Sequence, residues 1–269
     1  AAGGLHGFLS RPDRPIITDS GGFQVFSLQH RSDEGDPSPT RNPNAPHLKA
    51  SSGKHRSWRS SVLKVEESGV RFRSYRDGSI VELTPESSVR AQKAYGADII
   101  IPLDEVPPYH IGREELEKSV HRSHRWMARS LQEHLRDIRQ QAMYGVIHGG
   151  VDKHLRQLSV DYLTQLPFDG YASGGALGKD REEMLDLLQF VVPQLPSARP
   201  IHLLGIADEE SILKAVPLGV DTFDSAFPTR VARHGMQQMV AVTRTAHDHI
   251  GSVAQIRCAL LRHRWPSNE

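Results

Sequence analysis

Three aspartates of the sequence each stand directly after a short apolar segment. They are Asp19, Asp104 and Asp224, which follow Pro15–Thr18, Asp98–Leu103 and Gly219–Phe223. Such segments are typical of β-strands, and Pro228 requires the last one to end near Asp224, because proline cannot donate to a central ladder. Carboxylates that converge on one site can displace a group at a sugar carbon, since one attacks the anomeric carbon while another manages the leaving group's proton. Carboxylates also cap helices, open turns and bind metals, so residue type alone leaves the chemistry open.

Similar segments recur between the second and third aspartates. Met143–Ile147 precedes His148, Gly170–Ala172 precedes Ser173, and Ile201–Leu204 precedes Gly205. Helical patterns separate the segments, at about 84–95, 113–136, 152–166, 180–192 and 208–216. Strands that alternate with helices form a parallel sheet whose site lies at the carboxyl ends of the strands. We therefore expect an α/β fold resembling a (β/α)8 TIM barrel, with a doubly wound open sheet as the alternative. Only six such strands can be counted, so the barrel is expected to be incomplete.

Other parts of the chain carry weaker signals. Val70–Tyr75 and Ile80–Leu83 flank a turn at Asp77-Gly78 and predict a β-hairpin. Residues 29–61 contain almost no apolar side chain, which predicts a disordered insertion within a barrel domain at 1–236, followed by a divergent tail at 237–269. The helix at 113–136 carries a basic stretch, for which a solvated face is favoured over a phosphate contact. This stretch consists of Arg122, His124, Arg125 and Arg129.

The composition excludes several classes of protein. The 269 residues can bury one substantial core, and the net charge of +1 gives no overall attraction to polyanions. The single cysteine, Cys258, excludes an internal disulfide framework and a multi-cysteine zinc site. No run of 18 apolar residues is present, and the amino terminus lacks the apolar region of a signal peptide.

Seven motifs in order along the chain closely resemble the tRNA-guanine transglycosylase, or queuine tRNA-ribosyltransferase, family. They are ITDSGGFQVFSL (17–28), FRSYRDG (72–78), GADIIIPLDE (96–105), YGVIHGG (144–150), LPFDGYASGGALG (166–178), HLLGI (202–206) and GVDTFDSAFPTRVARHG (219–235). The resemblance covers about Gly3 to Met236, apart from the insertion. It implies an irregular (β/α) barrel enzyme that exchanges guanine at the tRNA wobble position for a 7-deazaguanine base, a queuosine precursor in bacteria and queuine in eukaryotes.

The resemblance also assigns roles to the three aspartates. Asp224 matches the nucleophile, which attacks C1′ of the ribose and holds the tRNA covalently while the bases exchange. Asp19 matches the general acid/base that also holds the base, with Ser20 beside it. Asp104 matches the carboxylate that reads the guanine-like edge of the purine, whose amino group and ring N–H are donors.

Further residues match positions that bind the base or the tRNA. Gly175 corresponds to the backbone amide that binds the base carbonyl, with Gly174 beside it, and Phe23 to the aromatic ring that stacks on the base. Arg230 and Arg233 correspond to residues that grip the anticodon loop. An enzyme of this kind extrudes its target base, which requires a deep pocket with an aromatic face.

Three base-site positions depart from the usual family pattern. His148 replaces a glutamine that hydrogen-bonds the base, and histidine can likewise donate and accept. Val106 and Gly178 stand where bacterial enzymes that use the precursor tend to carry cysteine and valine. The smaller Gly178 would leave room for the cyclopentenediol of queuine, so queuine is the expected incoming base.

Two features of the family have no counterpart in this sequence. The first two barrel strands would precede Ala1, and the Cys-x-Cys-x-x-Cys plus His motif of the structural zinc site is absent after Met236. We therefore expect no metal and no other cofactor in this chain. Open barrel edges expose unpaired backbone groups, which favours association with a partner.

The expected partners are a tRNA with a GUN anticodon, queuine or a related base, and a second subunit in a homodimer or heterodimer, with no membrane. The expected location is the cytoplasm or an organelle. The main alternative is a non-catalytic tRNA-binding or partner subunit, although such a paralogue would usually have lost Asp224. An unrelated aldolase or phosphatase would need a lysine or metal cluster at the strand ends, and neither is seen.

Overall fold

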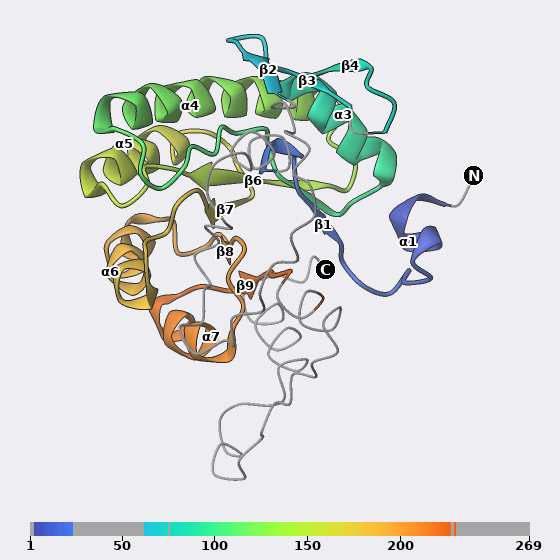
Figure 1. Cartoon of the computed structure of the whole chain (residues 1–269). Helices are drawn as coiled ribbons and strands as arrows, with labels where there is room; N and C mark the ends of the chain where they lie inside the picture. Colours follow the sequence, from blue (N-terminus) through green and yellow to red (C-terminus); the bar gives the residue numbers. More distant parts are fainter. Residues whose placement is uncertain (1–2, 24–61, 75, 227–228, 230–269) are drawn as a thin grey trace, which may run out of the picture.

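The computed structural model describes residues 3–23, 62–74, 76–226 and 229, and its centre is a six-stranded sheet in the order β1-β5-β6-β7-β8-β9. All neighbouring strands in this sheet are parallel. The strands are β1 (Ile17–Thr18), β5 (Ile99–Ile100), β6 (Ala142–Ile147), β7 (Gly170–Ser173), β8 (Ile201–Leu203) and β9 (Thr222–Phe223). The sheet curls into a half-barrel (Figure 1), which confirms the predicted α/β fold with six strands of an incomplete (β/α) barrel.

Helices connect the strands and lie on the outer side of the curled sheet (Figure 1). They are α3 (Pro85–Tyr95), α4 (Arg113–Leu135), α5 (Lys153–Leu163), α6 (Arg181–Val191) and α7 (Glu209–Ala215), with short 3₁₀ turns η1 (Val192–Gln194) and η2 (Val216–Leu218). All five predicted helices are confirmed to within three residues at each end. The structure adds α1 (Gly4–Phe8), a five-residue helix that the sequence pattern did not predict.

The helix boundaries follow from local side-chain chemistry. Thr84 and Ser87 form a reciprocal capping box at the start of α3, and Gly96 ends this helix in a left-handed conformation with φ of 74°. Aspartate side chains accept backbone N–H bonds at the starts of α5, α6 and α7; they are Asp152, Asp180 and Asp208. These caps set where each connection from a strand enters its helix.

A second sheet of three antiparallel strands, in the order β2-β3-β4, packs beside α3 and α4 (Figure 1). Its strands are β2 (Val62–Val65), β3 (Val70–Arg73) and β4 (Ile80–Leu83). The predicted hairpin is therefore confirmed, whereas β2 was missed because it does not alternate between apolar and polar residues. Val70, Leu103 and Trp126 form a buried cluster beneath this sheet.

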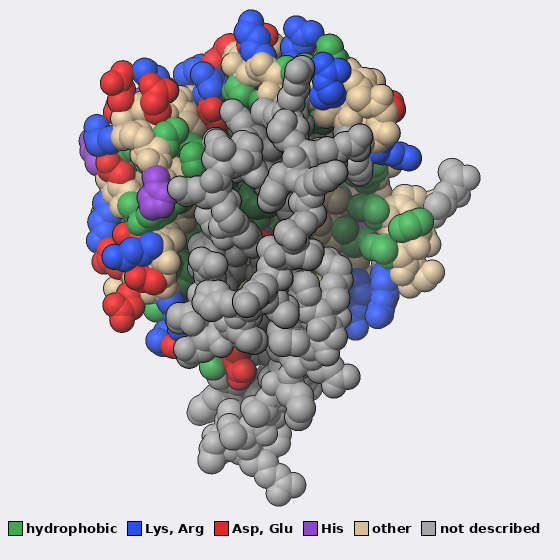
Figure 2. Space-filling view, in the orientation of Figure 1, with side chains coloured by type: hydrophobic (Ala, Val, Ile, Leu, Met, Phe, Trp, Pro, Cys, Tyr) green, Lys and Arg blue, Asp and Glu red, His purple; other side chains and the backbone are tan. Residues whose placement is uncertain are grey.

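The basic stretch of α4 is only in part the solvated face that was favoured for it, since Arg125 is exposed whereas His124 is buried. Arg125 and Arg129 form ion pairs with Glu67 and Glu86. Arg122 pairs with Glu105, and His124 is buried with its Nε2 atom 3.0 Å from the Ser159 hydroxyl. The stretch therefore joins α4 to the small sheet, to α3 and to the connection after β5. Elsewhere on the described surface, basic and acidic side chains are interspersed (Figure 2).

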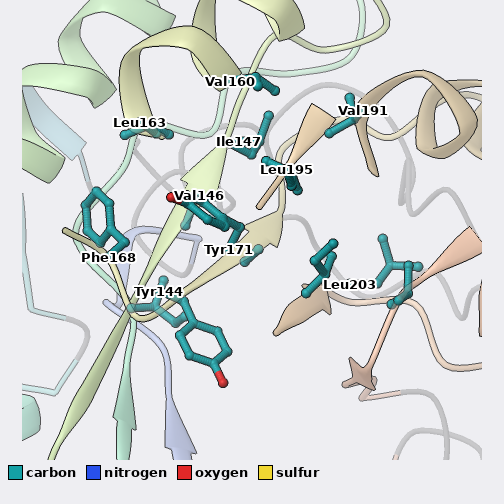
Figure 3. Close-up of a cluster of buried hydrophobic side chains, with 14 of the residues drawn as sticks. Tyr144, Val146, Ile147, Val160, Leu163, Phe168, Tyr171, Val191, Leu195 and Leu203 are labelled. Atoms are coloured by element: carbon teal, nitrogen blue, oxygen red, sulfur yellow. The ribbon is translucent and has the colours of Figure 1, made fainter. Parts of the chain in front are cut away.

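The main core lies between the sheet and its helices. Figure 3 shows a cluster of buried side chains that includes Tyr144, Val146, Ile147, Tyr171 and Leu203 from strands and Val160, Leu163 and Val191 from helices. Five of the six residues of β6 are buried, as expected for a central parallel strand covered on both faces. This core fixes the carboxyl ends of the strands, where the candidate functional residues lie.

Two predicted segments cannot be compared with the structure. The insertion at 29–61 and the tail at 237–269 both lie outside the described residues. No helix in the described part of the chain is long and apolar enough to cross a membrane.

Candidate active site

The carboxyl ends of the six parallel strands form one rim, and nearly every strand delivers a polar residue or glycine to it. In sheet order these are Asp19 after β1, Asp104 after β5, His148 after β6, Gly174 and Gly175 after β7, Gly205 after β8 and Asp224 after β9. Because the strands are parallel, side chains that are distant in sequence gather at this rim. The structure thus brings the three predicted aspartates to the same end of the half-barrel.

Asp104 and His148 form a buried pair at the centre of the rim. The Oδ2 atom of Asp104 lies 2.7 Å from Nε2 of His148, and the two residues are only 5% and 3% exposed. Gly175 packs against this pair, since a Cβ atom built on it would lie 3.2 Å from Nδ1 of His148. Gly175 also has φ of 71°, which favours glycine. Three of the predicted base-binding residues are therefore in direct proximity.

The loop after β1 packs onto the same pair. The Ser20 amide donates to Oδ1 of Asp19 at 2.8 Å, and the Gly22 amide donates to the Ser20 hydroxyl at 3.2 Å. A Cβ atom built on Gly22 would lie 2.8 Å from the Asp104 carbonyl oxygen, so only glycine allows this approach. The Ser88 hydroxyl fixes the loop from α3 by donating to the Ser20 carbonyl at 2.8 Å.

Asp19 has a strongly perturbed carboxyl group. One side of the residue is open to solvent, yet the surrounding protein desolvates the carboxylate, and this desolvation is the largest cause that raises its pKa from 3.8 to about 6. The negative charge of Asp104 raises the pKa further and that of Asp224 adds a smaller amount, whereas the Ser20 amide opposes them. A carboxyl group with a pKa near 6 can both release and accept a proton near neutral pH.

Asp224 is shifted in the opposite direction. Desolvation raises the pKa of its carboxyl group, but hydrogen bonds from His202 and from the Gly205 amide outweigh this effect and hold the pKa below its usual value of 3.8. The Oδ1 atom accepts from the Gly205 amide at 2.9 Å and from Nε2 of His202 at 3.2 Å. The side chain remains 55% exposed, so an ionised carboxylate faces the solvent at the rim.

Comparison with known proteins agrees with this arrangement. A family model described as queuine tRNA-ribosyltransferase matches residues 42–251 of the chain. The queuine tRNA-ribosyltransferase of Protochlamydia amoebophila is 57% identical over 235 residues, which cover 87% of this chain and 57% of that protein. The chain belongs to the queuine tRNA-ribosyltransferase family. Relatives of that name from Chlamydia caviae and Chlamydia felis are 48% and 47% identical over 236 residues, covering 88% of this chain and 60% of each relative.

The chain spans only 57% to 60% of the length of these curated relatives. The membership confirms the resemblance that the seven motifs indicated. The residues matched by the family model include every described strand of the main sheet from β5 onward, with the rim residues from Asp104 to Asp224, whereas β1 and Asp19 precede the matched range.

The sequence pattern did not predict His202 as a residue of the site. The side chain is only 1% exposed, and its two ring nitrogens contact Thr222 and Asp224. The available signal was a histidine between apolar residues of a predicted strand, because a buried ring nitrogen must find a hydrogen-bond partner.

Arg156 was also missed. This fully buried residue of α5 donates to three backbone carbonyls: those of Ile147, the last residue of β6, of Gly150 in the loop after β6, and of Ala176 in the loop after β7. Burial lowers the pKa of the Arg156 guanidinium to about 9. No carboxylate pairs with it among the described residues, so its role there is to join the two loops that carry His148 and Gly175.

A cavity of about 200 Å³ lies beside His148 and Gly175. It extends from the ends of β6 and β7 toward the first turn of α4, where Arg113 and Leu116 line it. Tyr109 stands at its edge and donates to Glu183 of α6 at 3.1 Å. Of the predicted base-binding residues, His148 and Gly175 border this cavity.

The remaining predicted site residues differ in their exposure and contacts, and two of them are not described by the structure. Phe23 is 57% exposed, and Val106 is half-buried two residues beyond Asp104. The Gly174 amide donates to the Ile147 carbonyl at 3.3 Å and is therefore used within the protein. Arg230 and Arg233 lie outside the described residues.

The backbone conformation at residue 178 explains why this residue is glycine. Its φ is 122°, and a Cβ atom built on it would lie 3.0 Å from Cβ of Glu183 and 3.1 Å from the amide nitrogen of Met184. That atom would point at the start of α6, so the backbone conformation accounts for glycine here. The expected preference for queuine gains no support from the size of this residue.

The described residues do not suit the structural zinc of the family. No group of three or more His, Cys, Asp or Glu side chains in the described ranges could hold a metal ion. The segment after Met236, where the resemblance places the zinc motif, lies outside those ranges and contains Cys258 as its single cysteine. No step of the chemistry below depends on a metal.

Proposed function

We propose that the protein containing this chain exchanges guanine at the wobble position of a tRNA with a GUN anticodon for queuine or a related 7-deazaguanine. One observation carries the proposal: two carboxyl groups at the same rim have opposite pKa shifts, with Asp224 lowered and Asp19 raised to about 6. A nucleophile must be ionised, whereas a group that protonates a leaving base must hold a proton near neutral pH. Membership of the family supports the same assignment.

In the proposed reaction, Asp224 attacks C1′ of the ribose. The bond between C1′ and the purine nitrogen breaks, its electron pair passes to the base, and Asp19 supplies the proton with which guanine leaves. The incoming base then attacks C1′, gives its proton to Asp19 and releases the Asp224 carboxylate. Each half of the exchange is thus balanced by the same two groups.

Base recognition is assigned to the buried pair. Oδ2 of Asp104 is engaged by His148, so Oδ1 is the oxygen that would accept from the amino group and ring N–H of a guanine-like edge. Gly175 would present its amide to the base carbonyl, and Phe23 would stack on the ring. Arg230 and Arg233 are proposed to bind the anticodon loop, and a second subunit to complete the assembly. A cytoplasmic location is proposed, with an organelle as the alternative.

Base exchange tests this proposal directly. The protein is incubated with labelled guanine and an anticodon stem-loop carrying guanine at the wobble position, and label in the RNA is counted. We expect incorporation, none with a stem-loop carrying adenine at that position, and none with Asp224→Asn. A folded protein that binds the stem-loop without incorporating label would support the alternative of a non-catalytic tRNA-binding subunit.

A further inference from the structure

The two oxygens of the Asp224 carboxylate have different surroundings. Oδ1 accepts two hydrogen bonds, from the Gly205 amide at 2.9 Å and from Nε2 of His202 at 3.2 Å. Among the described residues, Oδ2 has no hydrogen-bond partner. Since a carboxylate oxygen that already accepts two bonds is a weaker nucleophile than a free one, the two oxygens are unequal.

The pairing of β8 with β9 fixes the position of the His202 ring. His202 lies directly opposite Thr222 in the parallel ladder, and Nδ1 of the ring is 2.8 Å from the Thr222 hydroxyl oxygen. The imidazole is almost completely buried, so both of its nitrogens need partners within the protein. Thr222 and Asp224 supply these partners from the same strand end.

The contacts also determine the tautomer of His202. An ionised carboxylate can only accept, so Nε2 must carry the hydrogen that is donated to Asp224. In the neutral ring Nδ1 is then an acceptor, and the Thr222 hydroxyl must donate to it. The direction of donation therefore runs from Thr222 to His202 and from His202 to Asp224.

We propose that His202 and Thr222 are positioning residues that hold Oδ1 of Asp224 and leave Oδ2 as the atom that attacks C1′ of the ribose. This inference rests on the proposed function. The Oδ2–C1′ bond forms while the bond from C1′ to the purine breaks, and the electron pair leaves with the base, which is protonated by Asp19. His202 is buried and its ring nitrogens contact Thr222 and Asp224, so its proposed effect is on the orientation of the carboxylate.

Matched variants separate positioning from packing. His202→Leu keeps most of the buried volume and removes the donor, whereas His202→Gln keeps a nitrogen that can donate to Oδ1. Thr222→Val removes the hydroxyl at nearly constant shape, whereas Thr222→Ser retains it. Denaturant unfolding and stem-loop binding are measured for each variant, so that effects on folding and on affinity are known separately.

The decisive measurement is the single-turnover rate of covalent adduct formation with saturating wobble-guanine stem-loop. We expect His202→Leu to lower this rate about 100-fold, the size of a small misplacement of a reacting group, with unchanged stem-loop affinity. Thr222→Val should lower it about 10-fold, because Nδ1 of the buried ring then loses its partner and the ring is held less precisely. His202→Gln and Thr222→Ser should recover most of the rate.

Three results distinguish the possible failures. Equal rates for Thr222→Val and Thr222→Ser would overturn the inference, even if His202→Leu does not fold. Equal losses for His202→Leu and His202→Gln would overturn it as well, since packing alone would then explain them. No adduct with the unsubstituted, folded protein would instead contradict the proposed function itself.

Discussion

The negative charge of Asp224 raises the pKa of Asp19, although these residues follow β9 and β1, the two outermost strands of the main sheet. In a flat sheet the two carboxylates would be separated by four intervening strands. The curl of the half-barrel brings both edges toward one opening (Figure 1). One substrate can therefore meet a carboxylate from each edge, with the Asp104–His148 pair between them.

Asp19 should make the stability of the protein depend on pH. Its pKa is about 6 in the folded protein against 3.8 ordinarily, so the folded state binds more protons between these values. The free energy of unfolding should therefore fall as pH rises from about 4 to about 6, and the loss should persist above that range. Asp19→Asn should be more stable than the parent protein at pH 7.5, with a difference that disappears below pH 4.

Denaturant unfolding at pH 4, 5, 6 and 7.5 measures this difference. Asp13→Asn is the control, because Asp13 is an exposed carboxylate close in the chain and away from the strand ends. A stability difference for Asp19→Asn that is the same at pH 4 and 7.5 would show that folding does not raise the pKa of this carboxyl group.

The buried pair should tolerate a replacement that keeps the hydrogen bond. His148→Leu leaves the Asp104 carboxylate buried without its donor, which should cost about 3 kcal/mol of stability. His148→Gln keeps a donor near the same place and should cost about 1 kcal/mol or less. Chemical denaturation compares the two variants, and similar costs would mean that the hydrogen bond to Asp104 contributes little.

Much of the main sheet could be predicted, because each strand is a short apolar run that ends at a residue unsuited to a strand. The ends at Asp19, His148 and Asp224 were found in this way. The contact between His202 and Asp224 could not be found, since it depends on the register between two strands. Arg156 was missed for another reason. An arginine on an amphipathic helix usually faces solvent, whereas this one donates to three backbone carbonyls at the ends of β6 and β7.

Arg156 should stabilise the rim without taking part in the chemistry. Arg156→Met leaves the Gly150 and Ala176 carbonyls without their donor, whereas the Ile147 carbonyl keeps the Gly174 amide. The variant should cost about 3 kcal/mol of stability, since each carbonyl left without a donor carries a desolvation penalty. Arg199→Met is the matched control at an exposed arginine and should cost less than about 0.5 kcal/mol. Urea unfolding of both variants provides the comparison, and equal costs would contradict the role assigned to Arg156.

We expect Gly175 to be needed for base binding because a side chain there would crowd His148, and not only because of its backbone conformation. Gly175 and Gly78 have nearly equal φ values of 71° and 75°, but a Cβ atom on Gly175 would crowd His148, whereas one on Gly78 would meet nothing within 4 Å. Gly175→Ala and Gly78→Ala should each cost about 1 kcal/mol of stability. Only Gly175→Ala should also weaken guanine binding, measured by calorimetry. Unchanged guanine affinity in Gly175→Ala would place the base elsewhere.

The proposed mechanism depends most on Asp224 being the nucleophile. The protein is mixed with a wobble-guanine stem-loop and a base analogue that cannot complete the exchange, then separated on a denaturing gel, and the shifted band is digested for mass spectrometry. We predict an RNA adduct on the peptide that contains Asp224, and no adduct with Asp224→Asn. An adduct that persists in Asp224→Asn, or a folded parent protein that binds the stem-loop and forms none, would contradict the account.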